Sequence, residues 1–188
     1  MRFLSLVVVF IGLVAAAPAA VPATTTTKDQ MIVVPTAAPS GQEKNTTYWS
    51  AGCHPVTACE KSSYVDRKAP EGTTPADFHD CAALLSSFGE RNGTFSIPRA
   101  ADDDREYAFG EGHVNIVKSG SCAFSVRADK GLMVGNEDIV WIMQKAVLEN
   151  SAGTEMMARG SVKCNATDGG EKGGLYWQVH GIESADGY

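Results

Sequence analysis

The sequence has little positive charge, no second long apolar run and no pattern typical of an active site. Its formal net charge is −6, because 22 acidic residues outnumber 16 Lys and Arg residues. Nucleic acid and anionic membrane surfaces are bound by clustered Lys and Arg, so this balance argues against both as partners. Beyond the first 17 residues no stretch is long and apolar enough to span a membrane, and we expect no stable membrane insertion.

The sequence also lacks the close ligand pairs of a metal site. Cys53 and Cys59 stand six residues apart, whereas paired zinc ligands are usually about two to four residues apart. Asp102, Asp104 and Glu106 belong to an acidic run without the Gly and the terminal Glu of a calcium loop. We therefore expect no metal and no cofactor, and we interpret the acidic run as a solvated loop.

Signals of catalysis are equally scarce, since the chain contains no Gly-x-Ser-x-Gly elbow. His79 and Asp80 precede Cys81, but neighbouring helical side chains point about 100° apart and are poorly placed for proton transfer. Asp80 and Asp138 stand near predicted helix starts, where the helix dipole explains a carboxylate. We predict no catalytic residue and no enzyme; a small hydrolase that depends on His79 or His113 is the alternative from another class.

What the sequence does contain begins with a secretion signal. Arg2 gives a positive start, an apolar run follows from Phe3 to Ala17, and Ala17-Pro18-Ala19 fits a cleavage site for signal peptidase. This order predicts a signal peptide over residues 1–19 and an extracellular mature protein. A transmembrane anchor would need about 20 apolar residues, and this run is shorter.

Residues 20–47 have the composition of a linker. Four consecutive threonines at 24–27, three prolines and many alanines give no apolar periodicity that could bury a face. In a secreted chain such a segment favours O-glycosylation. N-glycosylation sequons, each expected in a surface loop, begin at Asn45, Asn92 and Asn165. The folded domain is predicted to span residues 48–188.

The first predicted helix starts at Thr74, with Pro75 at its first position and Asp77 placed to complete a capping box. Gly89 is a natural stop. Its apolar stripe is formed by residues at steps of three and four, namely Phe78, Cys81, Leu85 and Phe88.

The second predicted helix follows Gly135 and ends before Gly153. Asn136 is expected to cap it, and Glu137 and Asp138 lie in the first turn, where negative charge is favourable. The expected buried face consists of Ile139, Ile142, Met143, Ala146 and Val147.

Alternating apolar and polar residues predict strands in the rest of the domain. The clearest run from Cys122 to Arg127, from Ala158 to Cys164 and from Leu175 to His180, each with one buried face. Hairpin turns are expected at Ser119-Gly120 and in the glycine-rich stretch 168–174. These elements predict an α+β fold, in which two amphipathic helices pack on one face of an antiparallel sheet. Three aromatic side chains are candidates for surface contacts, and ordinary half-buried packing is the alternative for each: Trp49, Trp141 and Tyr176.

Several short motifs occur in a recognisable order along the chain. They are Cys59-Glu60-Lys61-Ser62-Ser63-Tyr64, Asp80-Cys81, Ser121-Cys122-Ala123-Phe124-Ser125-Val126, Val134-Gly135-Asn136-Glu137-Asp138-Ile139, Gly160-Ser161-Val162-Lys163-Cys164 and Trp177. Through them the chain, from about Cys53 to Ile182, resembles the necrosis-inducing factor domain of secreted fungal effectors, the homologues of extracellular protein two.

This resemblance implies a secreted virulence factor that acts on host plants in the apoplast by provoking cell death, without an established catalytic residue. The expected partner is a host plant protein or receptor, and the expected state is a monomer. Similar domains look like relatives of fungal killer toxins, so an antimicrobial protein directed at competing microbes is the alternative function.

The resemblance places Cys59, Cys81, Cys122 and Cys164 in two disulfides. Four cysteines allow three connectivities, and the sequence does not choose among them. Cys53 is additional to the family pattern. We expect it to be a free thiol or to be available for an intermolecular bond; the alternative is that Cys53 pairs in place of Cys59.

Overall fold

A computed structural model describes residues 32–33, 47–69, 71–100 and 112–182. The predicted signal peptide, most of the predicted linker, Asn45 and the acidic run from Asp102 to Glu106 lie outside the described residues. Of the linker, only Thr47 and the two-residue strand β1 (Ile32–Val33) are described. None of the described helices is long and apolar enough to cross a membrane.

The largest element is a six-stranded antiparallel sheet with the order β1-β6-β7-β12-β11-β3. Its longer strands are β3 (Cys59–Lys68), β6 (Val114–Ser119), β7 (Cys122–Ala128), β11 (Ala158–Cys164) and β12 (Gly173–Gly181). The predicted hairpins join β6 to β7 and β11 to β12. Gly120 has a φ of 52° in the first of these turns, a value that favours glycine.

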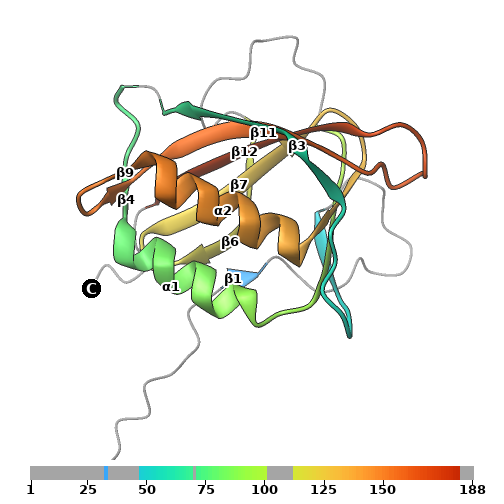
Figure 1. Ribbon diagram of the computed structural model, residues 1–188, viewed down its shortest axis with the longest axis horizontal. Helices are drawn as coiled ribbons and strands as arrows, with labels where there is room; N and C mark the ends of the chain where they lie inside the picture. The colour runs from blue at the N-terminus through green and yellow to red at the C-terminus, as the bar shows by residue number, and fades with distance from the viewer. Residues whose placement is uncertain (1–31, 34–46, 70, 101–111, 183–188) are drawn as a thin grey trace, which may run out of the picture.

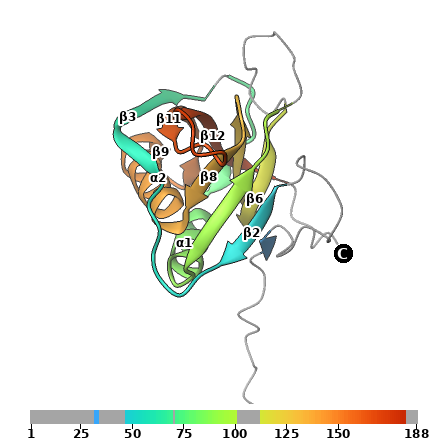
Figure 2. The same ribbon diagram turned by 90° about the vertical axis from the view of Figure 1, so that its right-hand side faces the viewer.

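Helices α1 (Phe78–Gly89) and α2 (Asn136–Asn150) lie side by side on one face of this sheet (Figures 1 and 2). This confirms the predicted α+β architecture. Apolar side chains from both helices and from the sheet form one core, in which the largest buried residues include Trp177, Phe88, Phe95, Phe124 and Leu84. We call this side of the sheet the helix face and the other side the outer face.

Two small antiparallel sheets complete the fold, and neither was predicted. One has the order β2-β5-β8, from Tyr48–Ala51, Gly93–Ile97 and Leu132–Gly135. The other has the order β4-β10-β9, from Ala76–Asp77, Glu155–Met156 and Ser151–Ala152. The strands of the second sheet have two residues each and carry no measurable alternation, so a sequence pattern does not reveal them.

The start of α1 differs from the prediction. The helix begins at Phe78, and Asp77 is its N-cap, with a carboxylate oxygen that accepts from the backbone N–H of His79 at 2.7 Å. Thr74 instead uses its carbonyl to bind the N–H of Gly181 on β12. The prediction placed the cap too early because Thr-Pro is a common start, whereas here the intervening residues pair with β10. The buried stripe uses Leu84 rather than Leu85, which is half-buried.

The start of α2 also needs a correction, because Gly135 and not Asn136 is the N-cap. Asn136 is the first helical residue, and its side chain accepts a hydrogen bond from a distant backbone N–H, that of Val56. The predicted apolar face is otherwise correct, with Val147 only half-buried. Strand β7 likewise departs from the one-sided pattern, since all seven of its residues are buried.

Candidate functional site

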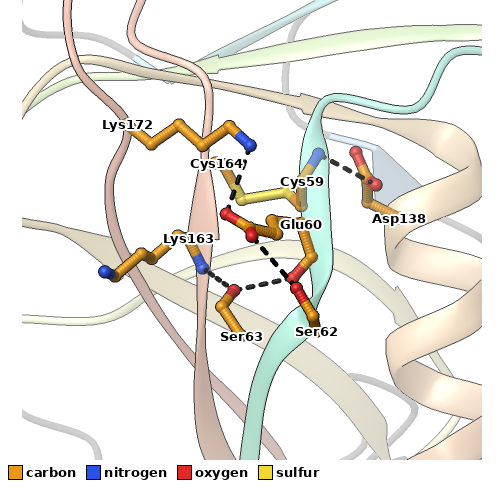
Figure 3. Close-up of polar contacts among 8 residues, drawn as sticks. All are labelled: Cys59, Glu60, Ser62, Ser63, Asp138, Lys163, Cys164 and Lys172. Atoms are coloured by element: carbon orange, nitrogen blue, oxygen red, sulfur yellow. Dashed lines mark hydrogen bonds and ion pairs between the residues drawn. A yellow bond between two sulfur atoms is a disulfide. The ribbon is translucent and has the colours of Figure 1, made fainter.

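One group of motif residues surrounds the disulfide between Cys59 and Cys164 (Figure 3). The two cysteines are direct partners in the pairing of β3 with β11. Since β3 is the edge strand of the large sheet, the bridge fixes that edge covalently. The sequence separation of 105 residues means that the bridge connects distant parts of the chain.

Asp138, at the start of α2, holds the chain on the other side of this bridge. Its carboxylate accepts from the backbone N–H groups of Ala58 at 2.7 Å, Gly135 at 2.8 Å and Cys59 at 3.1 Å. Asn136 binds the N–H of Val56 at 2.8 Å in the same way. The motif from Gly135 to Asp138 therefore attaches residues 56–59 to the helix N-terminus.

The carboxyl group of Asp138 is almost fully buried, at 1% exposure. Burial raises its pKa, because the charged form loses hydration, while the three N–H donors act in the opposite direction. Each of its hydrogen bonds goes to the backbone, and no proton acceptor or nucleophile is among them. This is the environment of a structural carboxylate.

The solvent side of the same bridge carries an ion pair and a serine network (Figure 3). Glu60 binds Lys172 at 3.2 Å and accepts from Ser62 at 3.0 Å. These hydrogen bonds, the one from Lys172 first, lower the pKa of Glu60. Ser63 accepts from the backbone N–H of Lys163 at 2.8 Å and so joins β3 to β11 at a bulge in their pairing. An exposed pair of this kind contributes little to stability.

The second disulfide, between Cys81 and Cys122, attaches α1 to β7. The residues that precede the two cysteines also bind each other. Asp80 accepts from the N–H of Ser121 at 2.8 Å and from its hydroxyl at 2.7 Å. The Asp-Cys and Ser-Cys motifs of the sequence are thus two halves of one junction.

The candidates for nucleophilic catalysis do not form a site. Cys81 is bonded to Cys122 and has no thiol, so it cannot act with His79, whose side chain is exposed. His113 lies 3.3 Å from the amide of Gln178, and His180 lies 3.0 Å from the carbonyl of Gly181. Within the described ranges, no three His, Cys, Asp or Glu side chains group together as metal ligands would.

The four cysteines that were expected to pair form the two bridges described above, and Cys53 is a free and exposed thiol. The alternative pairing through Cys53 is absent. Of the two described sequons, Asn165 is exposed and follows β11, in the surface connection that was expected. Asn92 is half-buried just before β5, and its carbonyl accepts from the N–H of Gly52.

The three aromatic candidates for surface contacts have different positions. Trp49 is 4% exposed, and its ring packs against Phe88 and Phe95 with centroid distances of 5.6 and 4.8 Å. The prediction for Trp49 was wrong because β2 belongs to a sheet that the sequence did not reveal. Trp141 and Tyr176 are half-buried, on the helix face and the outer face respectively.

Trp141 belongs to a surface group that we call the aromatic–lysine cluster: Lys61, Tyr64, Trp141 and Lys145. The rings of Tyr64 and Trp141 meet edge to face with centroids 5.1 Å apart. Lys61 lies 5.4 Å from the centroid of Trp141, and Lys145 lies 5.1 Å from that of Tyr64. Burial, with smaller contributions from Asp66 and Glu149, raises the pKa of Tyr64, so its hydroxyl is neutral.

The cluster packs on the buried core, and an exposed leucine lies near it on the same helix. Tyr64 stacks on the buried Trp177 with an interplanar angle of 14°, which fixes the position of its ring. Leu148, two turns after Trp141 on α2, is 83% exposed. Tyr and Trp rings that are held in place and partly exposed are typical of protein contact surfaces.

The amino-acid sequence is similar to that of one known protein family. Residues 58–164, more than half of the chain, match the sequence model of a family described as "Pathogen effector; putative necrosis-inducing factor". The match confirms the resemblance noted in the sequence and includes all four bridged cysteines. No curated protein matches the chain significantly.

Proposed function

Because the chain belongs to this family of pathogen effectors, we propose that it is a secreted, non-enzymatic effector. In this proposal it binds a host plant protein in the apoplast and thereby promotes the death of host cells. The family match is the observation that carries the proposal.

The use of the motif residues supports a binding protein rather than an enzyme. Asp80 and Asp138 bind backbone N–H groups beside the disulfides, and the bridged cysteines are covalently occupied. The partly exposed aromatic–lysine cluster is suited to contact, since aromatic residues are enriched where proteins bind each other. The proposed division is therefore between a disulfide-stapled scaffold and a contact surface.

Two observations support secretion. The sequence begins with a predicted signal peptide, and two disulfides persist best in an oxidising compartment. The bridges also supply stability that a modest core lacks in a dilute extracellular fluid.

Leaf infiltration tests the proposal. Purified mature protein would be infiltrated into several plant genotypes, beside the same protein after reduction and alkylation. We expect cell death, measured as ion leakage, with the oxidised protein in at least one genotype and none with the alkylated protein. The absence of a response in every genotype would contradict the proposed role in cell death.

A variant of the cluster tests whether contact is the mechanism. Trp141→Ala removes a half-buried ring from the cluster, and Tyr48→Ala removes a half-buried ring from a different sheet as the matched control. We expect the first variant to lose most of the response and the second to retain it, with both proteins folded at the assay temperature by circular dichroism. A full response from a folded Trp141→Ala protein would exclude this surface.

A further inference from the structure

The outer face of the large sheet carries several positively charged side chains, although the chain as a whole is negatively charged. Strand registers place four cationic side chains that are at least partly exposed on this face, and these are Arg67, Lys118, Arg159 and Lys163; a fifth, Arg127, is buried. The single carboxylate that shares a register position with them on the described strands is Glu60, which is bound by Lys172. In a chain with a net charge of −6, this face is a local exception.

Two of these side chains are placed in an unfavourable way. Arg67 on β3 and Arg159 on β11 are direct partners in the antiparallel pairing, which places their Cβ atoms about 5 Å apart. Like charges in that position destabilise a sheet. Neither guanidinium forms an ion pair with any carboxylate of the described chain, and the Nε of Arg159 is buried without a hydrogen-bond partner.

The same row of the sheet continues with hydrogen-bonding side chains. Gln178 on β12 is the direct partner of Arg159 and also of Ser125 on β7. Ser125 is only 1% exposed, and its hydroxyl has no partner among the described residues. Because Ser125 and Gln178 are both buried, the donors in this row that a docked partner can reach are those of Arg67 and Arg159.

An oxyanion held between the arginines would compensate these costs. The guanidinium group presents its N–H donors as a planar fork that binds carboxylate oxygens two at a time. We infer that Arg67 and Arg159, with Lys163 four residues further along β11 on the same face, bind carboxylate groups of an acidic polypeptide on the outer face. This deepens and rests on the proposed function, since it states the chemistry of a protein partner; it uses the face opposite the aromatic–lysine cluster.

The surroundings of the arginine pair favour a polypeptide over a long uniform polyanion. Val65 is 48% exposed in the next row, where Ser161 separates it from the half-buried Tyr176. A peptide with alternating acidic and apolar side chains can contact both the charges and this apolar area. Nucleic acid or an anionic polysaccharide extends beyond the basic face, where it meets the negative charge of the rest of the molecule.

The test is a binding titration with a fluorescein-labelled peptide of alternating Glu and Leu, followed by fluorescence anisotropy at low salt. The comparison probes are single-stranded DNA and polygalacturonate. We expect the native protein to prefer the peptide, and Arg159→Gln and Arg67→Glu to weaken its binding by about tenfold or more, as expected for a lost hydrogen bond to a charged group.

The matched control is Arg91→Glu, which changes the net charge as Arg67→Glu does but lies in an exposed turn after α1. It should bind the peptide like the native protein. Arg67→Glu should also raise the temperature of thermal unfolding, because a carboxylate then faces Arg159 permanently. That rise separates loss of the site from loss of the fold.

Three results would overturn the inference: unchanged peptide binding by both site variants, equal weakening by Arg91→Glu, or tighter binding of DNA or polygalacturonate than of the peptide. The titration involves no plant tissue. A failed leaf assay with intact peptide binding would therefore count against the cell-death role alone, and failed peptide binding with intact cell death would count against this site alone.

Discussion

Asp138 combines two opposing requirements at a single residue. It is buried, which favours a neutral carboxyl, and it accepts three backbone hydrogen bonds, which favour a charged one. One carboxylate accepts all three hydrogen bonds, because the side chain reaches both its own helix start and residues 58–59. The residue therefore connects two segments that are about 80 positions apart in the sequence.

Asp138→Asn should destabilise the protein. An amide replaces one accepting oxygen by a donor that faces a backbone N–H, and a buried donor without an acceptor costs about 1–3 kcal/mol. The measurement is urea unfolding followed by circular dichroism. Asp168→Asn is the control, because Asp168 is exposed and binds only Gly170; it should change the free energy of unfolding by less than about 0.5 kcal/mol. Equal effects would contradict the structural role of Asp138.

The pH dependence of stability follows from the pKa of Asp138. Burial raises that pKa above its ordinary value of 3.8, so just above pH 3.8 the native state binds a proton that the unfolded state has released. The contribution of Asp138 to the free energy of unfolding therefore falls as the pH rises through this window. We expect the stability difference between the native protein and Asp138→Asn to be largest near about pH 3 and to narrow toward neutrality. A difference that widens with pH would mean that the N–H donors outweigh burial.

At the scale of elements, the two disulfides act on different layers. Cys59–Cys164 fixes the edge strand β3 to β11 within the sheet, and Cys81–Cys122 fixes α1 onto the sheet. Each bridge has a polar junction beside it, in which an aspartate binds a backbone N–H of the opposite segment. Several motifs of the sequence therefore consist of the bridged cysteines and of the residues that bind the backbone beside them.

The two bridges should differ in their contributions to stability. Their sequence separations are 105 residues for Cys59–Cys164 and 41 for Cys81–Cys122. In the chain-entropy description these loops correspond to about 5 and about 4 kcal/mol. Paired Cys→Ala variants of each bridge, compared by urea unfolding, should therefore both be destabilised, the 59/164 variant by about 1 kcal/mol more. The opposite order would show that strain or residual unfolded structure dominates.

The elements that the sequence predicted well are those with local, repeated signals. Both helices, the two hairpins and the strands β7, β11 and β12 have enough residues to show a period. The cap of α1 and the burial of Trp49 were mispredicted because each depends on a short strand that pairs with a distant one. The same limit applies to Arg67 and Arg159, which are 92 positions apart and become neighbours only through the register of β3 with β11.

The aromatic–lysine cluster was predicted only in part, since the sequence indicated Trp141 as a surface candidate but did not indicate Tyr64, Lys61 or Lys145.

At the scale of the whole molecule, the number of reactive thiols tests the covalent framework. The chain has five cysteines, and the structure leaves Cys53 free and exposed. We expect intact-mass analysis after alkylation to show one label on the native protein and five after reduction and unfolding. Cys53→Ser should show none before reduction. Three or more labels on the native protein would be incompatible with two bridges.

The order of the bridged cysteines has a further consequence for resistance to proteolysis. Both bridges join a cysteine in the first half of the chain, Cys59 or Cys81, to one in the second half, Cys122 or Cys164. A single cut anywhere between residues 81 and 122 therefore releases nothing, because the two fragments stay joined at two points. The strands of one fragment also remain paired with those of the other, as β3 is with β11. Such a nicked molecule would migrate as one species on a gel without reductant and as two after reduction. Separation of the fragments would therefore require reduction of the bridges as well as cleavage of the chain.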